Sequence, residues 1–313
     1  MTLETFAEEM KIRVQEKAGN HYEVNLERCL GNNGTEVIRL AVKKESHSGT
    51  APAALLNGFY NQISEKESED FLEEMAEEIV RLFCFSDFVE NYGETRAAQI
   101  MDYDFCKDKL LFKLVNTVLN QELLLDRPHI PFLDLSITFY VRLEERDGME
   151  TRVPVNEFLR ETWKMTAQEL YQQALRNAPE IMPARFAEMD QTAAFLLLMD
   201  EEMTAGILDL LPPVENMKAD TLDCLTNYLV RNGASVLLYP GLLKECAAKC
   251  GKDLVILPSS VDDVLLMPLS DDNKLNELTE MVRGINQSVL EPGKVLSDHV
   301  YRYDYENDQI VMA

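Results

Sequence analysis

The chain has 313 residues, and 55 Asp and Glu against 30 Lys and Arg give it a formal net charge of −25. So many carboxylates repel phosphate groups, which argues against nucleic acids and anionic membrane surfaces as partners. The simplest interpretation of the acidity is that it keeps an intracellular protein soluble. The sharper interpretation is an acidic face that binds a basic protein or mimics a nucleic acid.

No segment of the sequence predicts export or a membrane span. The N-terminus lacks the basic and apolar regions of a secretory signal, and the longest purely apolar runs are far shorter than the ~18 residues of a span. Six cysteines scattered through a chain of this size predict reduced thiols rather than a disulfide framework. We therefore expect a cytoplasmic protein without a membrane segment.

The first predicted elements are a helix over residues 2–18 and two strands at 21–28 and 35–44. Apolar side chains recur along one stripe of the helix, at Leu3, Phe6, Met10 and Val14. The sequence LGNNG between the strands supplies the Asn and Gly residues that a hairpin turn requires. A second amphipathic helix is predicted over 71–83, with its glutamates facing outward.

The middle of the chain predicts more sheet and another helix. Residues 110–119 fit either a buried strand or a helix. Residues 132–145 alternate strictly between apolar and polar, which predicts one long strand with a buried face and a wet face. A partner strand is expected near 149–155, and Thr166 with Glu169 forms the capping-box pattern that begins a helix.

Prolines and methionines then interrupt the pattern between residues 179 and 217. We place the domain boundary in this stretch. The expected organisation is an N-terminal α+β domain over 1–180, a connecting segment over 181–220 and a C-terminal α+β domain over 221–313. A single compact unit is the alternative.

The C-terminal part predicts the order ββαββαββ. Strands at 221–231 and 234–239 flank Asn232-Gly233, the strongest hairpin signal in the chain. A helix follows between Pro240 and Gly251, and then two apolar strands at 253–257 and 264–268. The last helix precedes a final hairpin of strands at 299–305 and 309–312. Local hairpins make a sheet mainly antiparallel, so the predicted fold class is α+β with covering helices.

Most of the chain resembles an uncharacterised bacterial family, the domain-of-unknown-function family fifty-six eighty-eight. The resemblance rests on four segments, LTNYLVRNGASVLLYPG, GKDLVILPSSVDDVLLMP, VLSDHVYRYD and VPVNEFLRETWKMTAQELYQQAL. It implies no activity, cofactor or catalytic residue that could be transferred to this sequence.

The sequence contains none of the common nucleotide-binding, zinc-protease, hydrolase or EF-hand motifs. Cys246 and Cys250 are the candidates for a metal site, because residues four apart share one face of the predicted helix. Zinc requires two further ligands that no nearby Cys or His supplies, so buried thiols are the simpler interpretation. We assign no metal and no cofactor.

The candidate for chemistry is the stretch from Asp298 to Asp304. In a strand, His299, Tyr301 and Tyr303 share one face while Asp298 faces the other, so Asp298 cannot pair directly with His299. The structural alternative is that the aromatic side chains simply cover the sheet. We assign no catalytic residue and keep His299, Tyr301 and Tyr303 as candidates.

Three functional hypotheses follow from these observations. The leading one is a non-enzymatic cytoplasmic protein that binds another protein. The runner-up is an enzyme with its site near His299, Tyr301 and Tyr303. A pocket that contains His299 beside a buried carboxylate from elsewhere in the chain would favour it. The third is an acidic antagonist of a nucleic-acid-binding protein.

Overall fold

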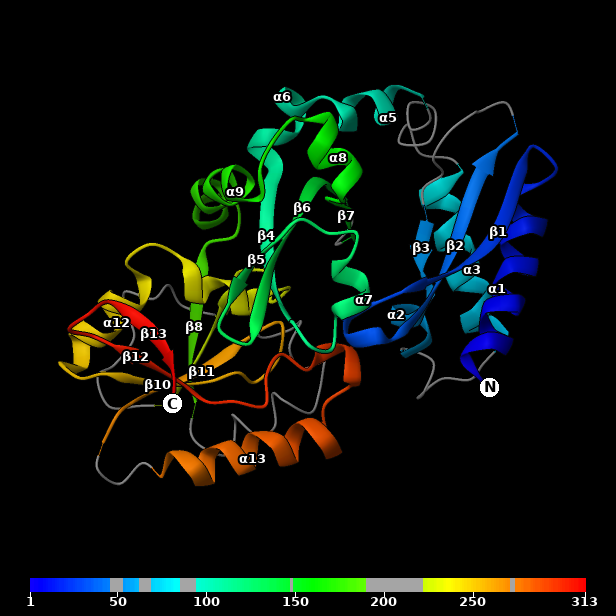
Figure 1. Cartoon of the computed structure of the whole chain (residues 1–313). Coiled ribbons are helices and arrows are strands. Elements are labelled where there is room, and N and C mark those ends of the chain that lie inside the picture. The colour runs from blue at the N-terminus through cyan, green and yellow to red at the C-terminus, as the bar shows by residue number, and fades with distance from the viewer. Residues whose placement is uncertain (46–52, 62–68, 85–93, 147–148, 190–221, 271–273) are drawn as a thin grey trace. The chain divides into compact units, whose positions relative to one another are not determined.

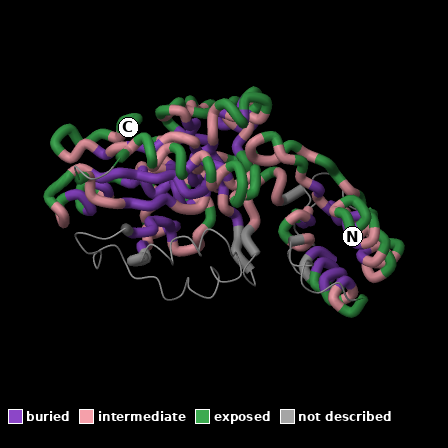
Figure 2. The backbone as a smooth tube through the Cα atoms, turned by 90° about the horizontal axis from the view of Figure 1, so that it is seen from below, coloured by how far each residue is buried: buried purple, intermediate pink, exposed green. Residues whose placement is uncertain are grey.

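The computed structural model describes residues 1–45, 53–61, 69–84, 94–146, 149–189, 222–270 and 274–313 (Figure 1). The chain divides into two compact units. Unit 1 contains residues 1–31 and 35–105, and unit 2 contains residues 32–34 and 106–313. Buried residues follow the strands of unit 2 (Figure 2). No helix among the described residues is long and apolar enough to cross a membrane.

Unit 1 packs helices on one face of a three-stranded antiparallel sheet, in the order β1-β2-β3. Its elements are α1 (Leu3–Ala18), β1 (Tyr22–Leu30), β2 (Glu36–Lys44), β3 (Ala53–Leu55), α2 (Leu56–Asn61), α3 (Glu69–Phe83), α5 (Glu94–Met101) and α6 (Tyr103–Cys106). The predicted stripe of α1 is confirmed, because Phe6, Met10 and Val14 lie fully buried in the core. The predicted hairpin at residues 21–44 is confirmed as β1 and β2.

The first part of unit 2 is a four-stranded antiparallel sheet, called sheet B here. Its elements are η3 (Lys107–Lys109), β4 (Leu110–Asn116), α7 (Gln121–Leu124), β5 (His129–Phe132), β6 (Leu135–Arg146), β7 (Met149–Pro154), α8 (Glu157–Thr162) and α9 (Ala167–Ile181). β6 lies centrally, with β4 on one edge and both β5 and β7 on the other. The predicted capping box of Thr166 and Glu169 opens α9, which packs alongside β4.

The predicted single strand over 132–145 is wrong in two respects. Leu133 and Asp134 form a turn between β5 and β6, and Leu133 adopts a left-handed conformation with φ of 54°. The expected wet face is also buried at Ser136, Thr138 and Tyr140. The reason is long-range packing, because later parts of unit 2 reach this face, for example through the Arg142 Nη2 to Tyr228 Oη hydrogen bond of 3.1 Å.

The second part of unit 2 is a six-stranded antiparallel sheet, sheet C, in the order β13-β12-β10-β11-β9-β8. Its elements are β8 (Ala184–Met189), β9 (Leu222–Asn227), η6 (Gly233–Leu238), α12 (Leu242–Cys250), β10 (Leu254–Leu257), β11 (Val264–Pro268), α13 (Leu275–Ser288), η7 (Pro292–Lys294), β12 (Tyr301–Asp304) and β13 (Gln309–Met312). α13 covers one face, with Val282 buried against Val255 and Leu257. The predicted α+β class with mainly antiparallel sheets is confirmed.

The predicted strand at 234–239 is wrong, so the ββαββαββ order does not hold at its second position. Residues Gly233–Leu238 form the 3-10 helix η6 after Asn232, which is left-handed with φ of 52°. β9 already pairs with β8 on one edge and β11 on the other, so no edge remains for a hairpin partner. The backbone instead turns against the β10–β11 connection, where Ala234 N donates to Val261 O at 3.2 Å.

The expected connecting segment at 181–220 falls mostly outside the described part of the chain. Its first residues form β8, and its residues from 190 onward are not described. The contact-based division of the chain falls between residues 105 and 106. The domain limits at 180 and 221 therefore stay a prediction.

Gly233→Ala should destabilise unit 2 by about 3 kcal/mol or more, because a new methyl group would meet backbone rather than a flexible side chain. A Cβ at Gly233 would lie 2.0 Å from both Asp262 O and Thr226 Oγ1. Gly284→Ala on α13 is the matched control, since a Cβ added there would have nothing within 4 Å. Removing a helical glycine should stabilise by about 0.5–1 kcal/mol. Urea unfolding measures both, and equal effects of the two variants would contradict the packing argument.

Candidate functional site

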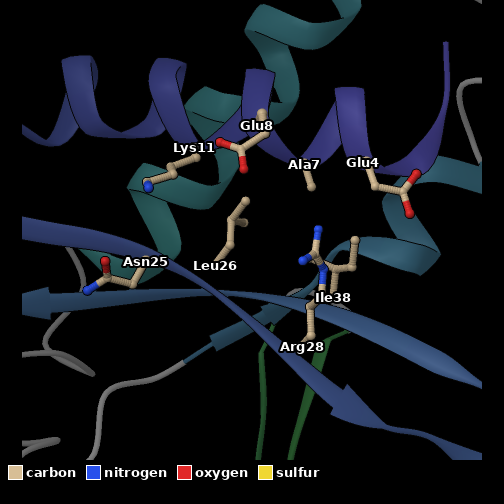
Figure 3. Close-up of a pocket in the computed structure, with 8 residues that line it drawn as sticks. All are labelled: Glu4, Ala7, Glu8, Lys11, Asn25, Leu26, Arg28 and Ile38. Carbon is tan, nitrogen blue, oxygen red and sulfur yellow. The ribbon is translucent and has the colours of Figure 1, made fainter.

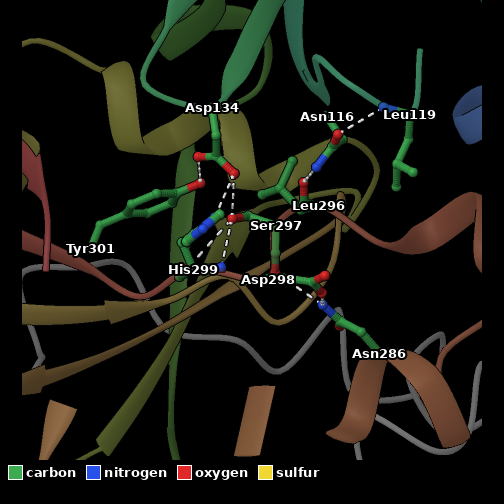
Figure 4. Close-up of polar contacts among 9 residues, drawn as sticks. All are labelled: Asn116, Leu119, Asp134, Asn286, Leu296, Ser297, Asp298, His299 and Tyr301. Atoms are coloured by element: carbon green, nitrogen blue, oxygen red, sulfur yellow. Dashed lines mark hydrogen bonds and ion pairs between the residues drawn. The ribbon is translucent and has the colours of Figure 1, made fainter. Parts of the chain in front are cut away.

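The candidate site centres on the carboxylate of Asp134, in the turn between β5 and β6. Three side chains contact it from the segment that leads into β12 (Figure 4). Tyr301 Oη donates to Oδ1 at 2.6 Å, and Ser297 Oγ donates to Oδ2 at 2.7 Å. His299 Nδ1 lies 3.3 Å from the same Oδ2. A carboxylate from elsewhere in the chain is one part of the condition that favours the runner-up hypothesis, and here 165 residues separate it from the histidine.

Local hydrogen bonds bend the segment so that alternate side chains reach Asp134. The backbone N of His299 donates to Ser297 Oγ at 2.9 Å, a local serine turn. Asn286 of α13 donates from Nδ2 to Ser297 O at 3.0 Å and to Asp298 Oδ1 at 2.7 Å. The segment is thus held from α13 on one side and from Asp134 on the other (Figure 4).

The four side chains of this cluster differ strongly in solvent exposure. Ser297 and Tyr301 are fully buried, while the side chain of His299 is 46% exposed and that of Asp134 is 20% exposed. Burial and the adjacent Asp134 carboxylate both raise the pKa of Tyr301 well above its ordinary value, so its hydroxyl stays a neutral donor. His299 is therefore the member of the cluster that can meet a ligand or partner.

The hydrogen-bond directions limit what the cluster can do chemically. A ring that donates Nδ1–H to a carboxylate keeps Nε2 as its acceptor, as in histidines that transfer protons. Covalent catalysis also needs a nucleophile bonded to that histidine. The Ser297 hydroxyl donates to Asp134 instead, and it is buried. The arrangement fixes one imidazole at the surface without activating a serine.

The other predicted site residues lie apart from this cluster. Tyr301 and Tyr303 share the buried face of β12, as strand alternation predicts, and Tyr303 Oη donates to Asp308 Oδ1 at 2.5 Å. Asp298 contacts Asn286 and makes no described contact with the ring of His299. The assignment of His299, Tyr301 and Tyr303 as site residues stays a prediction.

The cysteine candidates differ in their surroundings. Cys246 is buried, and burial raises the pKa of its thiol to about 12, so it stays protonated. Cys250 is partly exposed, and its Sγ donates to Ala247 O at 3.3 Å. In the described part of the chain, no group of three or more His, Cys, Asp or Glu side chains is arranged to hold a metal ion.

A separate pocket of about 210 Å³ lies in unit 1 between α1 and the β1–β2 hairpin (Figure 3). Its charged lining residues carry both signs, with Glu8 and Lys11 on α1 and Arg28 on β1. Arg28 also lies 3.4 Å from Glu36, a residue of β2. None of the predicted site residues lines this pocket.

Sequence reasoning missed Asp134 as the centre of the site. The alternating pattern of 132–145 placed it on the wet face of a strand, and no Gly or Asn marks the turn in which it lies. Its contacts with Ser297, His299 and Tyr301 are all long-range and have no local signature.

A double-mutant cycle should detect strong coupling between Asp134 and Tyr301. With Asp134→Asn and Tyr301→Phe, we expect a coupling free energy of unfolding of about 1.5–3 kcal/mol, because a buried hydroxyl serves a charged acceptor. Asp308→Asn with Tyr303→Phe is the matched cycle on the same strand. The Asp308 side chain is 53% exposed, so that coupling should stay below about 1 kcal/mol. Coupling of equal size in both cycles would show that Asp134 has no special role.

Comparisons with known proteins give one result. Neither a curated protein nor a solved structure matches the chain. A family model described as a family of unknown function, DUF5688, matches residues 3–305. The match spans both units and includes Asp134, Ser297, His299 and Tyr301. The chain therefore belongs to the DUF5688 family of unknown function.

Proposed function

We propose that the chain is a non-enzymatic protein that binds another protein through the end of sheet B where His299 contacts Asp134. We call this the turn surface and define it by Val118, Leu119, Leu133 and His299. The observation that carries the proposal is the exposure of three large apolar side chains at this end. Val118 is 69% exposed, Leu119 45% and Leu133 39%. Apolar side chains gathered at one place on a surface mark contact sites for partners.

The backbone brings these apolar residues together. Thr117 N donates to Asp134 O at 3.1 Å, which extends the pairing of β4 with β6 by one step beyond Asn116 and Leu135. Val118 and Leu133 are the next residues on each side. Leu119 N donates to Asn116 Oδ1 at 2.9 Å, which fixes the start of the β4–α7 connection. These hydrogen bonds thus hold the backbones of Val118 and Leu133 next to each other.

His299 gives the surface a polar anchor beside its apolar part. The contact with Asp134 restricts the imidazole, so little rotamer freedom is lost when a partner binds it. Protein interfaces combine an apolar core with polar groups around it, so an oriented imidazole beside exposed apolar side chains fits a protein contact. The same contacts support binding over the runner-up enzyme, because Tyr301 and Tyr303 are buried and Ser297 is directed to Asp134.

The acidic antagonist receives less support from unit 1. Basic side chains of α1 form ion pairs with the acidic side of α3. Arg13 Nη2 lies 2.5 Å from Glu69 Oε1, and Arg13 Nη1 lies 3.0 Å from Glu73 Oε2. Lys17 Nζ lies 2.6 Å from Glu73 Oε1 and 3.1 Å from Glu77 Oε1. These carboxylates stay exposed, but their cationic partners reduce the negative charge left for a basic partner. The cytoplasm is the proposed location, which the six free cysteines support.

Affinity capture from an extract of the native host tests the proposal. The immobilised wild-type chain should recover a specific protein, identified by mass spectrometry. Val118→Asp with Leu119→Asp should reduce the affinity of the purified partner by 10-fold or more, because a charge at an interface centre costs roughly 2 kcal/mol or more. Leu55→Asp is the matched control, an exposed leucine of β3 in unit 1.

The outcomes separate cleanly. Recovery by wild type and by Leu55→Asp, with loss in the Val118 and Leu119 variant, supports the turn surface as the contact site. Two results contradict it. One is the absence of any protein above background, and the other is equal affinity of the partner for wild type and for the Val118 and Leu119 variant.

A further inference from the structure

One face of sheet B carries polar side chains beneath the later part of unit 2. We call it the polar face and define it by Ser136, Thr138 and Tyr140 of β6. Cross-strand pairing places Lys113 of β4 directly opposite Thr138 on one side and His129 of β5 directly opposite it on the other. Directly paired residues point to the same face of a sheet. Lys113, Thr138 and His129 therefore form one row across the polar face.

Thr138, the middle residue of this row, has no hydrogen-bond partner among the described residues. The residue is 1% exposed, and its Oγ1 is buried without a donor or acceptor in the described structure. Nearly all buried polar side chains are paired, because an unmet hydroxyl costs about 1–3 kcal/mol. The orphaned hydroxyl indicates that this place accommodates a group that the described residues do not supply.

Positive charge concentrates around the same hydroxyl, in contrast to the chain as a whole. Lys113 is partly buried and has no hydrogen bond or ion pair with the described residues. Burial, together with the nearby Arg152 and Arg127, lowers the pKa of Lys113 to about 8. Arg152 lies over the ring of Tyr140, with its Cζ 5.3 Å from the ring centroid.

The carboxylates near Lys113 compensate its charge only in part. The negative charge of Asp262 raises the pKa of Lys113, whereas the two arginines lower it. However, Asp262 Oδ2 already contacts Lys294 Nζ at 2.7 Å. Asp126 lies 3.5 Å from Arg127, and its side chain is largely exposed. His129 Nδ1 contacts Arg127 O at 2.8 Å, which fixes the backbone that carries that arginine.

We propose that the polar face binds the phosphate group of a small molecule, held by Lys113, Arg127 and Arg152, with the Thr138 hydroxyl as a donor. A phosphate suits this set because it carries up to two negative charges and several strong acceptor oxygens, which guanidinium groups meet in pairs. Thr138 gains the partner that it lacks, and Lys113 gains a counterion. This site is independent of the turn surface, so either proposal can fail alone.

Isothermal titration of the full-length protein with inorganic phosphate at low ionic strength tests the site. Wild type should bind phosphate saturably, and Lys113→Gln should weaken binding 10-fold or more because a desolvated cation is lost. Thr138→Val keeps the side-chain shape without the hydroxyl and should weaken binding roughly 3- to 10-fold. Lys252→Gln, at an exposed lysine of unit 2, is the matched control and should bind as wild type does.

Absence of saturable binding in wild type overturns the proposal, as does equal affinity in Lys113→Gln. Sulfate and acetate distinguish the ligand class. Equal affinity for acetate overturns the assignment to phosphate, whereas sulfate, a tetrahedral dianion with the same kind of acceptor oxygens, should compete with phosphate.

A second measurement does not depend on binding and separates a site lysine from a structural one. Lys113→Met removes a repelled and partly buried charge, so the variant should unfold at the same or a higher temperature than wild type at pH 7. The folded pKa of about 8 lies below the unfolded value of 10.5, so the unfolded chain binds more protons between these pH values. Wild-type stability should therefore rise relative to Lys113→Met between pH 8 and pH 10.5. A clear loss of stability in Lys113→Met would assign Lys113 a structural role and overturn the proposal.

Discussion

The hydrogen bonds to the Asp134 carboxylate are the interaction on which the position of the segment before β12 depends. It is mostly buried, and a buried charge is tolerated only when hydrogen bonds satisfy it. Tyr301 and Ser297 meet this requirement from inside the core, and both are fully buried. Their bonds attach the segment before β12 to the turn that begins β6. The position of His299 at the surface is a consequence of that attachment.

Strand β6 connects the two proposed sites. Its first residue follows Asp134, and its fourth residue, Thr138, lies at the centre of the polar face. Both faces of this strand are buried, so polar residues along it need partners from distant parts of the chain. Asp134 finds such partners within the chain, while Thr138 does not find one among the described residues. That difference is why we assign a stabilising role to the first and a ligand to the second.

The sequence predicted the features that local patterns determine. The helix stripe of α1, the capping box of Thr166 and the alternation of Tyr301 and Tyr303 all depend on neighbours within a few residues. The errors arose where tertiary contacts override local preference. Asn232-Gly233 begins a 3-10 helix because both edges of β9 are occupied, and Ser136 to Tyr140 are buried because distant segments cover them. Asp134 and His299 are too far apart in sequence for any spacing rule to join them.

The hydrogen-bonding state of His299 tests this account most directly. Long-range nitrogen–proton NMR correlations of the imidazoles reveal which ring nitrogen carries the proton, and the chain has only four histidines to assign. The account predicts that neutral His299 carries its proton on Nδ1, bonded to Asp134, and that Asp134→Asn changes both nitrogen shifts. Neutral His299 with its proton on Nε2, and with shifts unchanged in Asp134→Asn, would contradict it.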